Sequence, residues 1–362
     1  MLKLIKKYLK KLINCLKAYW RYNLWHKIVC VVLAIFILST AIMYGLGQYY
    51  IYSQRNIPLQ LGVSFIPDQA EALGLNPKQT MDALLSIGVK HFRLTSYWSD
   101  MEPTPGHYDF STLDWEFAKA EAHHAKIILT VGLRQPDWPE CHMPTWVGNQ
   151  PMSWWQPKLE KFMTAVIERY KNSPALESYQ LENEYFLKGF GDCTNFSRQR
   201  LIDEYNLVKK LDPHHPIIIG RSNNAIGIPI GQPQANLFSI SVYRRVWDAN
   251  ITHRYLEYPW PAWYYAFLAE LQKIVDNNRN MIIGELQADT WTPHGLPITQ
   301  TTLAQQNESM NATRMAQNIR FAEATGMKQI YLWGAEYWYY RMEKLHDPSL
   351  WNVAKQFFAK TN

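Results

Sequence analysis

The first 53 residues of this 362-residue sequence lack acidic residues, and the second half of this segment lacks basic residues as well. Residues 1–27 contain eight Lys and Arg residues but no Asp or Glu, and no charged residue occurs from Ile28 to Ser53. An apolar run of about 20 residues is long enough to cross a bilayer. We therefore expect an uncleaved transmembrane signal-anchor at residues 28–48, with the basic residues keeping the amino terminus in the cytoplasm.

This assignment divides the rest of the chain into a leader at 1–27, a linker at 49–56 and an extracytoplasmic domain at 57–362. The leader is expected to be a basic amphipathic helix on the inner leaflet, with a solvated tail as the alternative. Its apolar residues at helical spacing are Leu2, Ile5, Leu9, Leu12 and Leu16. For the span, the alternative is a signal peptide cleaved at the small residues Ser39 and Ala41, which would give a secreted protein.

The basic excess is confined to the leader, because the remainder has 29 basic residues against 31 acidic ones. Without a basic stripe in the body, nucleic acid is not an expected partner. The sequence also lacks a Cys-x-x-Cys pair, a His-Glu-x-x-His motif, a calcium loop and a phosphate-binding glycine fingerprint. We therefore expect neither a metal site nor a cofactor.

Cysteine is scarce, with four residues in the whole chain. Cys15 and Cys30 fall in the leader and the span, whereas Cys141 and Cys193 fall in the body, where an extracytoplasmic location permits oxidation. A disulfide between Cys141 and Cys193 is one expectation, and two free thiols are the alternative.

Beyond residue 57, apolar β-rich runs alternate with segments of helical period, a pattern typical of a parallel sheet built from βα units. Eight strands are predicted, at residues 59–65, 89–95, 126–132, 176–183, 216–220, 238–243, 281–286 and 329–334. Eight such units favour a (β/α)8 TIM barrel over an open doubly wound sheet, although the region after the fifth strand is irregular.

Acidic residues occur where two of these apolar strands end. Glu184 follows the fourth strand and Glu285 lies near the end of the seventh. The carboxyl ends of barrel strands share one functional face, so the two carboxyl groups are expected to converge there. A pair of carboxyl groups is what glycosidic bond hydrolysis requires. Structural ion pairs with Arg93 or Arg221 are the alternative, and Glu182 could exchange roles with Glu184 if the strand ends differently.

The segment "YWSDMEPTPGHYDFSTLDW" resembles the region after strand two in clan A glycoside hydrolases, which include β-galactosidases, cellulases and β-xylosidases. The following "AKIILTVGLRQPDWP" resembles the third strand and loop of that clan, although the continuation "ECHMPTWV" has no clear equivalent. Asn183 and Glu184 resemble its strand-four Asn-Glu pair, and Glu285 resembles its strand-seven nucleophile.

This resemblance implies a retaining mechanism with Glu184 as acid/base and Glu285 as nucleophile. It also implies that Asn183 binds the sugar 2-hydroxyl, that Arg93 and Tyr243 hold the nucleophile, and that Trp333 forms an aromatic floor. Trp138 and Trp291 are weaker candidates for stacking on sugar. The lesser acidic candidates are Asp289 and Glu336, while Glu102 is expected to fix its own loop.

The combined expectation is a membrane-anchored, extracytoplasmic retaining hydrolase of β-linked oligo- or polysaccharide. A transglycosylase that remodels surface polysaccharide is one alternative, because a sugar hydroxyl can replace water in the second step. A catalytically silent carbohydrate-binding barrel is the other.

Overall fold

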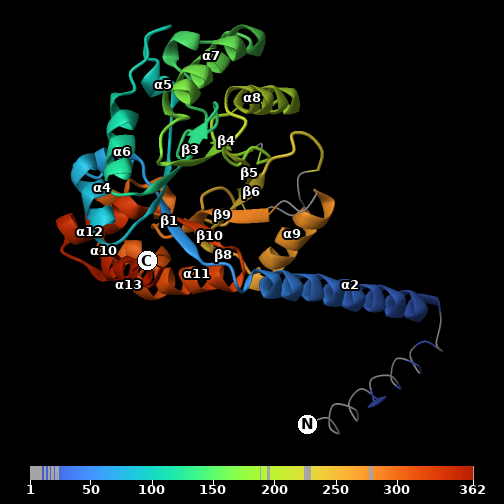
Figure 1. Ribbon diagram of the computed structural model, residues 1–362. Helices are drawn as coiled ribbons and strands as arrows, with labels where there is room; N and C mark the ends of the chain where they lie inside the picture. The colour runs from blue at the N-terminus through green and yellow to red at the C-terminus, as the bar shows by residue number, and fades with distance from the viewer. Residues whose placement is uncertain are drawn as a thin grey trace.

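The computed structural model describes residues 24–361 except 188, 194–195, 224–229 and 277–279, and also Lys10, Lys11, Asn14, Lys17 and Trp20. Eight parallel strands close a barrel in the order β1-β10-β9-β6-β5-β4-β3-β2 (Figure 1). They are β1 Gln60–Ser64, β2 His91–Leu94, β3 Lys126–Val131, β4 Leu176–Leu181, β5 Ile217–Asn223, β6 Leu237–Val242, β9 Asn280–Gln287 and β10 Gln329–Trp333. The expected TIM barrel is confirmed, and each strand overlaps one of the predicted runs.

Helices pack around the outside of this barrel. They are α3 Pro67–Ala72, α4 Pro77–Ser86, α5 Trp98–Met101, α6 Ser111–Ala122, α7 Met152–Tyr170, α8 Arg198–Leu211, α9 Ala262–Val275, α10 Leu303–Ser309, α11 Ala312–Ala324, α12 Ala335–Leu345 and α13 Ser349–Thr361. Several begin at caps that are legible in the sequence. At the start of α4, Asn76 accepts a hydrogen bond from the Gln79 amide and Pro77 occupies the first turn, where proline is favoured.

The irregular region after the fifth strand departs from a simple βα repeat. Residues 230–236, which form the described part of the connection from β5 to β6, contain no helix. After β6 the chain instead forms an antiparallel hairpin of β7 (Arg245–Asp248) and β8 (Arg254–Glu257) before α9 begins. Ala249, at the turn of this hairpin, reaches the cavity described below.

The amino-terminal helix α2 (Leu24–Gln54) projects from the side of the barrel (Figure 1). It contains an exposed apolar stretch that is long enough to cross a membrane. Its last turns pack on the barrel, because Gly47 lies against the backbone of α9 at Trp263 and the Tyr50 hydroxyl donates to Asn280 Oδ1 at 2.6 Å. These contacts keep residues 49–54 helical, although the sequence suggests a linker there.

Most of the expected amphipathic leader lies outside the described residues, including Cys15 and the apolar positions named above.

Inside the barrel, apolar side chains from β3, β5, β9 and β10 form a cluster: Ile128, Ile218, Ile282 and Tyr331. Polar side chains occupy the layer next to it, where Arg93 of β2 bonds to Gln180 of β4. The apolar cluster therefore forms the base on which the polar site is built.

Candidate active site

A cavity of about 590 Å³ lies at the carboxyl ends of the barrel strands. It is lined from six of the eight connections, by Gln69 after β1, Asp137 and Glu140 after β3, Glu184 after β4, Tyr243 after β6, Glu285 and Asp289 at the end of β9, and Trp333 at the end of β10. The structure thus brings Glu184 and Glu285, which are distant in sequence, into one cavity.

The backbone just after β4 is unusual, and it decides where the two nearby glutamates point. Glu182 and Glu184 both have positive φ, at 54° and 39°, a conformation that is uncommon outside glycine and clusters at functional sites. The neighbouring strand accommodates this turn through Gly220, where a β-carbon would lie 2.7 Å from both Glu182 O and Glu184 N. The two side chains consequently leave in different directions, although they are two residues apart.

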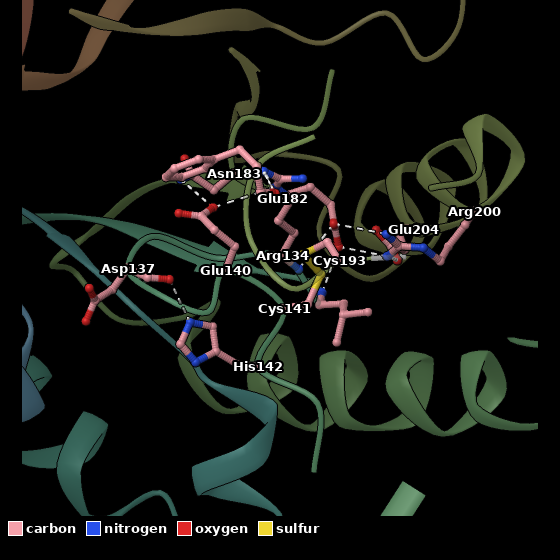
Figure 2. Close-up of a disulfide and its surroundings, with 12 residues drawn as sticks. Arg134, Asp137, Glu140, Cys141, His142, Glu182, Asn183, Cys193, Arg200 and Glu204 are labelled. Carbon is pink, nitrogen blue, oxygen red and sulfur yellow. Dashed lines mark hydrogen bonds and ion pairs between the residues drawn. A yellow bond between two sulfur atoms is a disulfide. The ribbon is translucent and has the colours of Figure 1, made fainter. Parts of the chain in front are cut away.

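Glu182 does not line the cavity. Its carboxylate accepts hydrogen bonds from the Leu133 and Arg134 amides at 2.7 and 3.2 Å and pairs with Arg200 of α8 at 2.9 Å. Glu204, one turn further along α8, also contacts Arg200 (Figure 2). Glu182 is therefore a structural residue, and Glu184 is the one that faces the cavity.

Glu285 is turned into the barrel by a β-bulge. Gly284 is skipped in the pairing of β9 with β6, and the pairing with β10 shifts in the same region. Ile282 faces the barrel interior, so strict alternation would turn Glu285, three residues later, outward. The bulge re-aims the carboxylate, as bulges beside functional sites often do. Apart from the glycine itself, no local pattern indicates this bulge.

Once turned inward, Glu285 is held by two strong donors. Arg93 Nη1 donates to Oε1 at 2.9 Å, and the Tyr243 hydroxyl donates to Oε2 at 2.9 Å. Arg93 is almost completely buried and also bonds to Ser64, Gln180 and Asn183. A guanidinium and a phenol therefore fix the position of this carboxylate, one at each oxygen.

Glu184 has the opposite environment. Its side chain is buried, and Oε1 makes no hydrogen bond to the described part of the chain. Burial, followed by the negative charge of Glu285, raises the pKa of Glu184 from 4.5 to about 7. One carboxyl group of the cavity is thus hydrogen-bonded at both oxygens, and the other is stabilised in its protonated form.

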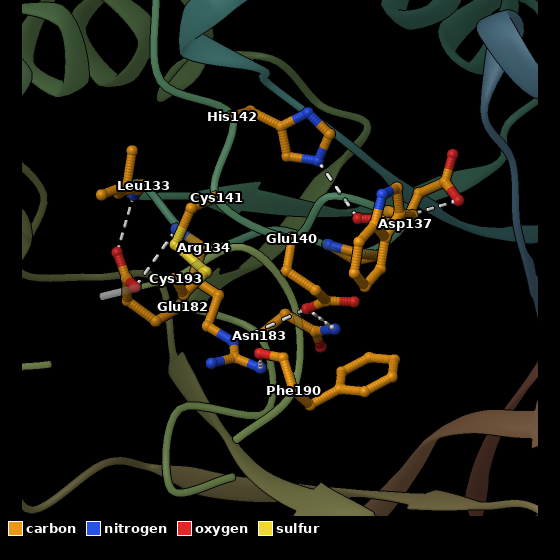
Figure 3. Close-up of polar contacts among 12 residues, drawn as sticks. Leu133, Arg134, Asp137, Glu140, Cys141, His142, Glu182, Asn183, Phe190 and Cys193 are labelled. Carbon is orange, nitrogen blue, oxygen red and sulfur yellow. Dashed lines mark hydrogen bonds and ion pairs between the residues drawn. A yellow bond between two sulfur atoms is a disulfide. The ribbon is translucent and has the colours of Figure 1, made fainter. Parts of the chain in front are cut away.

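Asn183 lies between these groups with its amide orientation fixed on both sides. Its Oδ1 accepts from Arg93 Nη2 at 2.8 Å and from Gln180 Nε2 at 3.2 Å. Its Nδ2 donates to Glu140 Oε2 at 3.3 Å (Figure 3). Because Oδ1 is occupied by two donors, the amide cannot reverse without losing both bonds. The second hydrogen on Nδ2 remains for a ligand.

The predicted aromatic residues also reach the cavity. Trp333 is buried at its base, Trp291 packs edge-on against Tyr243 with ring centroids 5.5 Å apart, and Trp138 is 62% exposed at the rim. Trp247 of the β7–β8 hairpin, for which the sequence left sugar stacking and plain packing about equally open, also lines the cavity. Flat apolar faces beside carboxyl groups suit a ring-shaped polyol.

Sequence reasoning missed two further acids of the β3 loop, Asp137 and Glu140, which both line the cavity. Glu140 immediately precedes Cys141, which the structure joins to Cys193 by a disulfide with a Cα–Cα distance of 5.4 Å (Figure 2). The adjacent cysteine was therefore the one available sign that this loop is held beside β4. Asp289, considered only as a lesser candidate, also lines the cavity.

Two other acidic candidates lie elsewhere. Glu336 is buried and accepts a hydrogen bond from the Ile66 amide at 2.6 Å, and Glu102 accepts from Trp98 Nε1 and the Gly106 amide at 2.5 and 2.7 Å. Both therefore fix local backbone. Among the described residues, no group of three or more His, Cys, Asp or Glu residues is arranged to hold a metal ion.

Comparison with known proteins gives partial sequence matches. A family model described as β-galactosidase matches residues 65–151. Probable mannan endo-1,4-beta-mannosidase F of Aspergillus flavus is 26% identical over 135 residues, which are 36% of this chain and 28% of that protein. The match thus spans less than a third of that relative's length.

Solved structures match over a larger part of the chain. A GH5_18 protein from Bifidobacterium longum subsp. infantis has a TM-score of 0.55 at 12% identity, covering 83% of this chain and 79% of its own. A catalytic mutant of Gan42B, a GH42 β-galactosidase from G. stearothermophilus, has a TM-score of 0.53 at 12% identity, covering 84% and 56%. These likenesses show a shared barrel fold. Together with the sequence matches, they confirm the expected resemblance to clan A glycoside hydrolases.

Proposed function

We propose that this chain is a retaining glycoside hydrolase of β-linked glycans. The contrast between two carboxyl groups in one cavity carries the proposal: Glu285 accepts hydrogen bonds from Arg93 and Tyr243, and burial raises the pKa of Glu184 to about 7. A retaining glycosidase needs one protonated carboxyl group as the acid and a second carboxyl group as the nucleophile. Partial matches to proteins named as β-galactosidase and mannan endo-1,4-β-mannosidase support the class.

In the first step, an oxygen of Glu285 forms a bond to the anomeric carbon while the glycosidic C–O bond breaks. Glu184 gives its proton to the departing oxygen, so the leaving group departs as an alcohol and Glu184 becomes the carboxylate. In the second step, Glu184 removes a proton from water, and the water oxygen displaces Glu285. Both carboxyl groups return to their starting states.

The surrounding residues position the sugar. The free N–H of Asn183 is available to the 2-hydroxyl, and this contact strengthens as positive charge develops on the ring. Trp333 lies at the base of the cavity, where it can support the sugar face, and Trp291 and Trp138 are placed along the wall and rim. Arg93 and Tyr243 act through Glu285 rather than on the substrate.

We further propose that α2 anchors the barrel in the cytoplasmic membrane, with the amino terminus inside and the catalytic domain outside. The apolar stretch of α2, the basic residues before it and the packing of its last turns on the barrel support this arrangement. The Cys141–Cys193 bridge suits an oxidising extracytoplasmic compartment,.

The test uses the full chain in detergent with a panel of aryl β-glycosides. Glu285→Gly should abolish turnover, and azide should restore it with formation of a glycosyl azide, because a small anion can fill the space left by the carboxylate. Glu182→Gly is the matched control, since that residue faces away from the cavity and azide should have no effect on it. Full activity in Glu285→Gly would remove this residue as nucleophile, and analysis of products with an added sugar acceptor would identify a transglycosylase.

A further inference from the structure

The cavity is strongly and uniformly acidic. Five carboxyl groups line it, from Asp137, Glu140, Glu184, Glu285 and Asp289. No Lys, Arg or His is among the described residues that line it. Two carboxyl groups suffice for the proposed reaction, so three remain to be explained by what the cavity binds.

The three additional acids differ in their partners. Glu140 has Arg134 Nε at 3.6 Å. Asp137 accepts from the Trp138 amide and from the side chain of Gln69 but has no cation within 4 Å among the described residues. Asp289 Oδ1 is buried without a hydrogen-bond partner in the described structure. Removing a carboxylate from water without a cation beside it is costly.

The electrostatic consequence is visible across the group. Burial is the largest cause that raises the pKa of Asp137, Glu140 and Asp289, and the charge of neighbouring carboxyl groups raises each further. A cationic ligand in the cavity would relieve both penalties at once, because it replaces lost hydration and offsets the mutual repulsion.

Glu140 is the best placed of the three to meet such a cation. It accepts a hydrogen bond from Asn183 Nδ2, the amide that also offers its second hydrogen to the ligand. The disulfide at the next residue ties this loop to the loop after β4 (Figures 2 and 3). Glu140 therefore presents a carboxyl group in a fixed position, ready to ionise against a cation, beside the group that Asn183 contacts, which is the C2 substituent of the sugar under the proposed function.

We propose that the sugar in this cavity carries a free ammonium group, as a 2-amino-2-deoxyhexose unit of a de-N-acetylated β-linked glycan, with Glu140 as its counter-ion. This proposal rests on the proposed function, because the position of C2 follows from the role given to Asn183. Asp137 and Asp289 extend the negative potential to further amino sugar units. An N-acetyl group would remove the charge that these carboxylates are placed to bind.

The test measures binding to the full-length Glu285→Gln variant in detergent, in which turnover is blocked. Three β-1,4-linked tetrasaccharides of glucose configuration differ only at C2: the glucosamine tetramer, its fully N-acetylated form and cellotetraose. Methyl β-galactosides with the same three C2 groups provide the second configuration. In at least one of the two configurations, the 2-amino sugar should bind at least about tenfold more tightly than the matching N-acetyl and 2-hydroxy sugars, as expected for a charge-assisted hydrogen bond. Added salt should reduce this preference.

Adding Glu140→Gln should lower amino sugar affinity about tenfold and leave cellotetraose affinity nearly unchanged. Asp289→Asn is a second variant that removes a carboxyl group. It breaks no hydrogen bond of Oδ1, because that atom has no partner in the described structure. Glu323→Gln, on the exposed surface of α11, is the matched control and should change neither affinity. Equal or tighter binding of the 2-hydroxy or N-acetyl sugars in both configurations would overturn the proposal, as would an amino sugar preference that persists in both variants. Failure of azide to restore turnover in Glu285→Gly would instead overturn the proposed function.

Discussion

Glu182 and Glu184 are two residues apart, and both side chains are buried, yet their surroundings differ completely. Glu182 lies in a network with two backbone amides and Arg200, while Glu184 lies in a cavity with Oε1 unpaired. The contrast separates two uses of buried charge. Glu182, surrounded by donors, stabilises the junction between the β3 loop and α8. Glu184, whose pKa is raised by burial despite a hydrogen bond from Ser241, keeps a proton available for chemistry,.

The largest expected effect comes from removing the acid of the cavity. Glu184→Gln should lower kcat about 10²- to 10⁴-fold, because general acid catalysis is lost. The free energy of unfolding, measured by urea titration, should stay the same or rise, since an amide replaces a buried carboxyl group whose Oε1 has no partner. Glu182→Gln is the matched comparison and should lose stability. A kcat within tenfold of wild type would contradict the role of Glu184.

The second effect concerns the buried ion pairs that Arg200 makes with Glu182 and Glu204. Arg200→Met should lower the free energy of unfolding by about 3–5 kcal/mol, because it leaves Glu182 and Glu204 buried without their cation. Urea denaturation monitored by tryptophan fluorescence measures the change. As a control, Arg169→Met breaks the exposed pair with Asp114 and should cost only about 0–1 kcal/mol. Similar losses in the two variants would mean that burial does not distinguish these pairs.

The third effect concerns Gly220, which packs against the backbone of both Glu182 and Glu184. Gly220→Ala should destabilise the fold by about 1–3 kcal/mol, as overpacked sites do, because the new methyl group would press on the backbone of Glu182 and Glu184. It should also lower kcat by displacing Glu184. Gly74→Ala is not a clean control, because Gly74 has positive φ; Gly189→Ala, with open space around it and ordinary φ, serves better.

The smallest effect is a pH dependence. Because the pKa of Glu184 is raised from 4.5 to about 7, kcat/KM should fall about tenfold per pH unit above neutrality as the acid loses its proton. The native state holds this proton between pH 4.5 and 7 and the unfolded chain does not. Stability from this group is therefore full below about pH 4.5 and decreases as pH rises through the window, by at most about 1.4 kcal/mol per unit.

Glu184→Gln should remove this contribution to the pH dependence of unfolding, and pH-dependent urea titration of the two proteins provides the comparison. The other raised carboxyl groups of the cavity, at Asp137, Glu140 and Asp289, have the same sign, so part of the slope should persist. A rate that stays constant to pH 9 would contradict the assignment of Glu184 as the acid.

Much of the fold could be predicted because strand periodicity is a local property. All eight barrel strands overlap the predicted runs, and the apolar helix at the amino terminus follows from its lack of charge. The β7–β8 hairpin was not predicted, because its short strands include the charged residues Arg245, Asp248, Arg254 and Glu257, and Val246 is their one buried residue. Residues 49–54 of the linker expected at 49–56 are helical and lie beside α9, a contact that no local pattern reveals.

The sequence by itself determined that Glu184 lies just after β4 and Glu285 near the end of β9, because the order of apolar and polar residues places them at strand ends. The tertiary structure alone decided which acids face the cavity. The bulge at Gly284 aims Glu285 inward, the positive φ angles after β4 send Glu182 and Glu184 apart, and the disulfide loop brings Glu140 to Asn183. Each of these depends on backbone geometry and on partners from distant segments, and electrostatic environment follows from such proximity rather than from residue order.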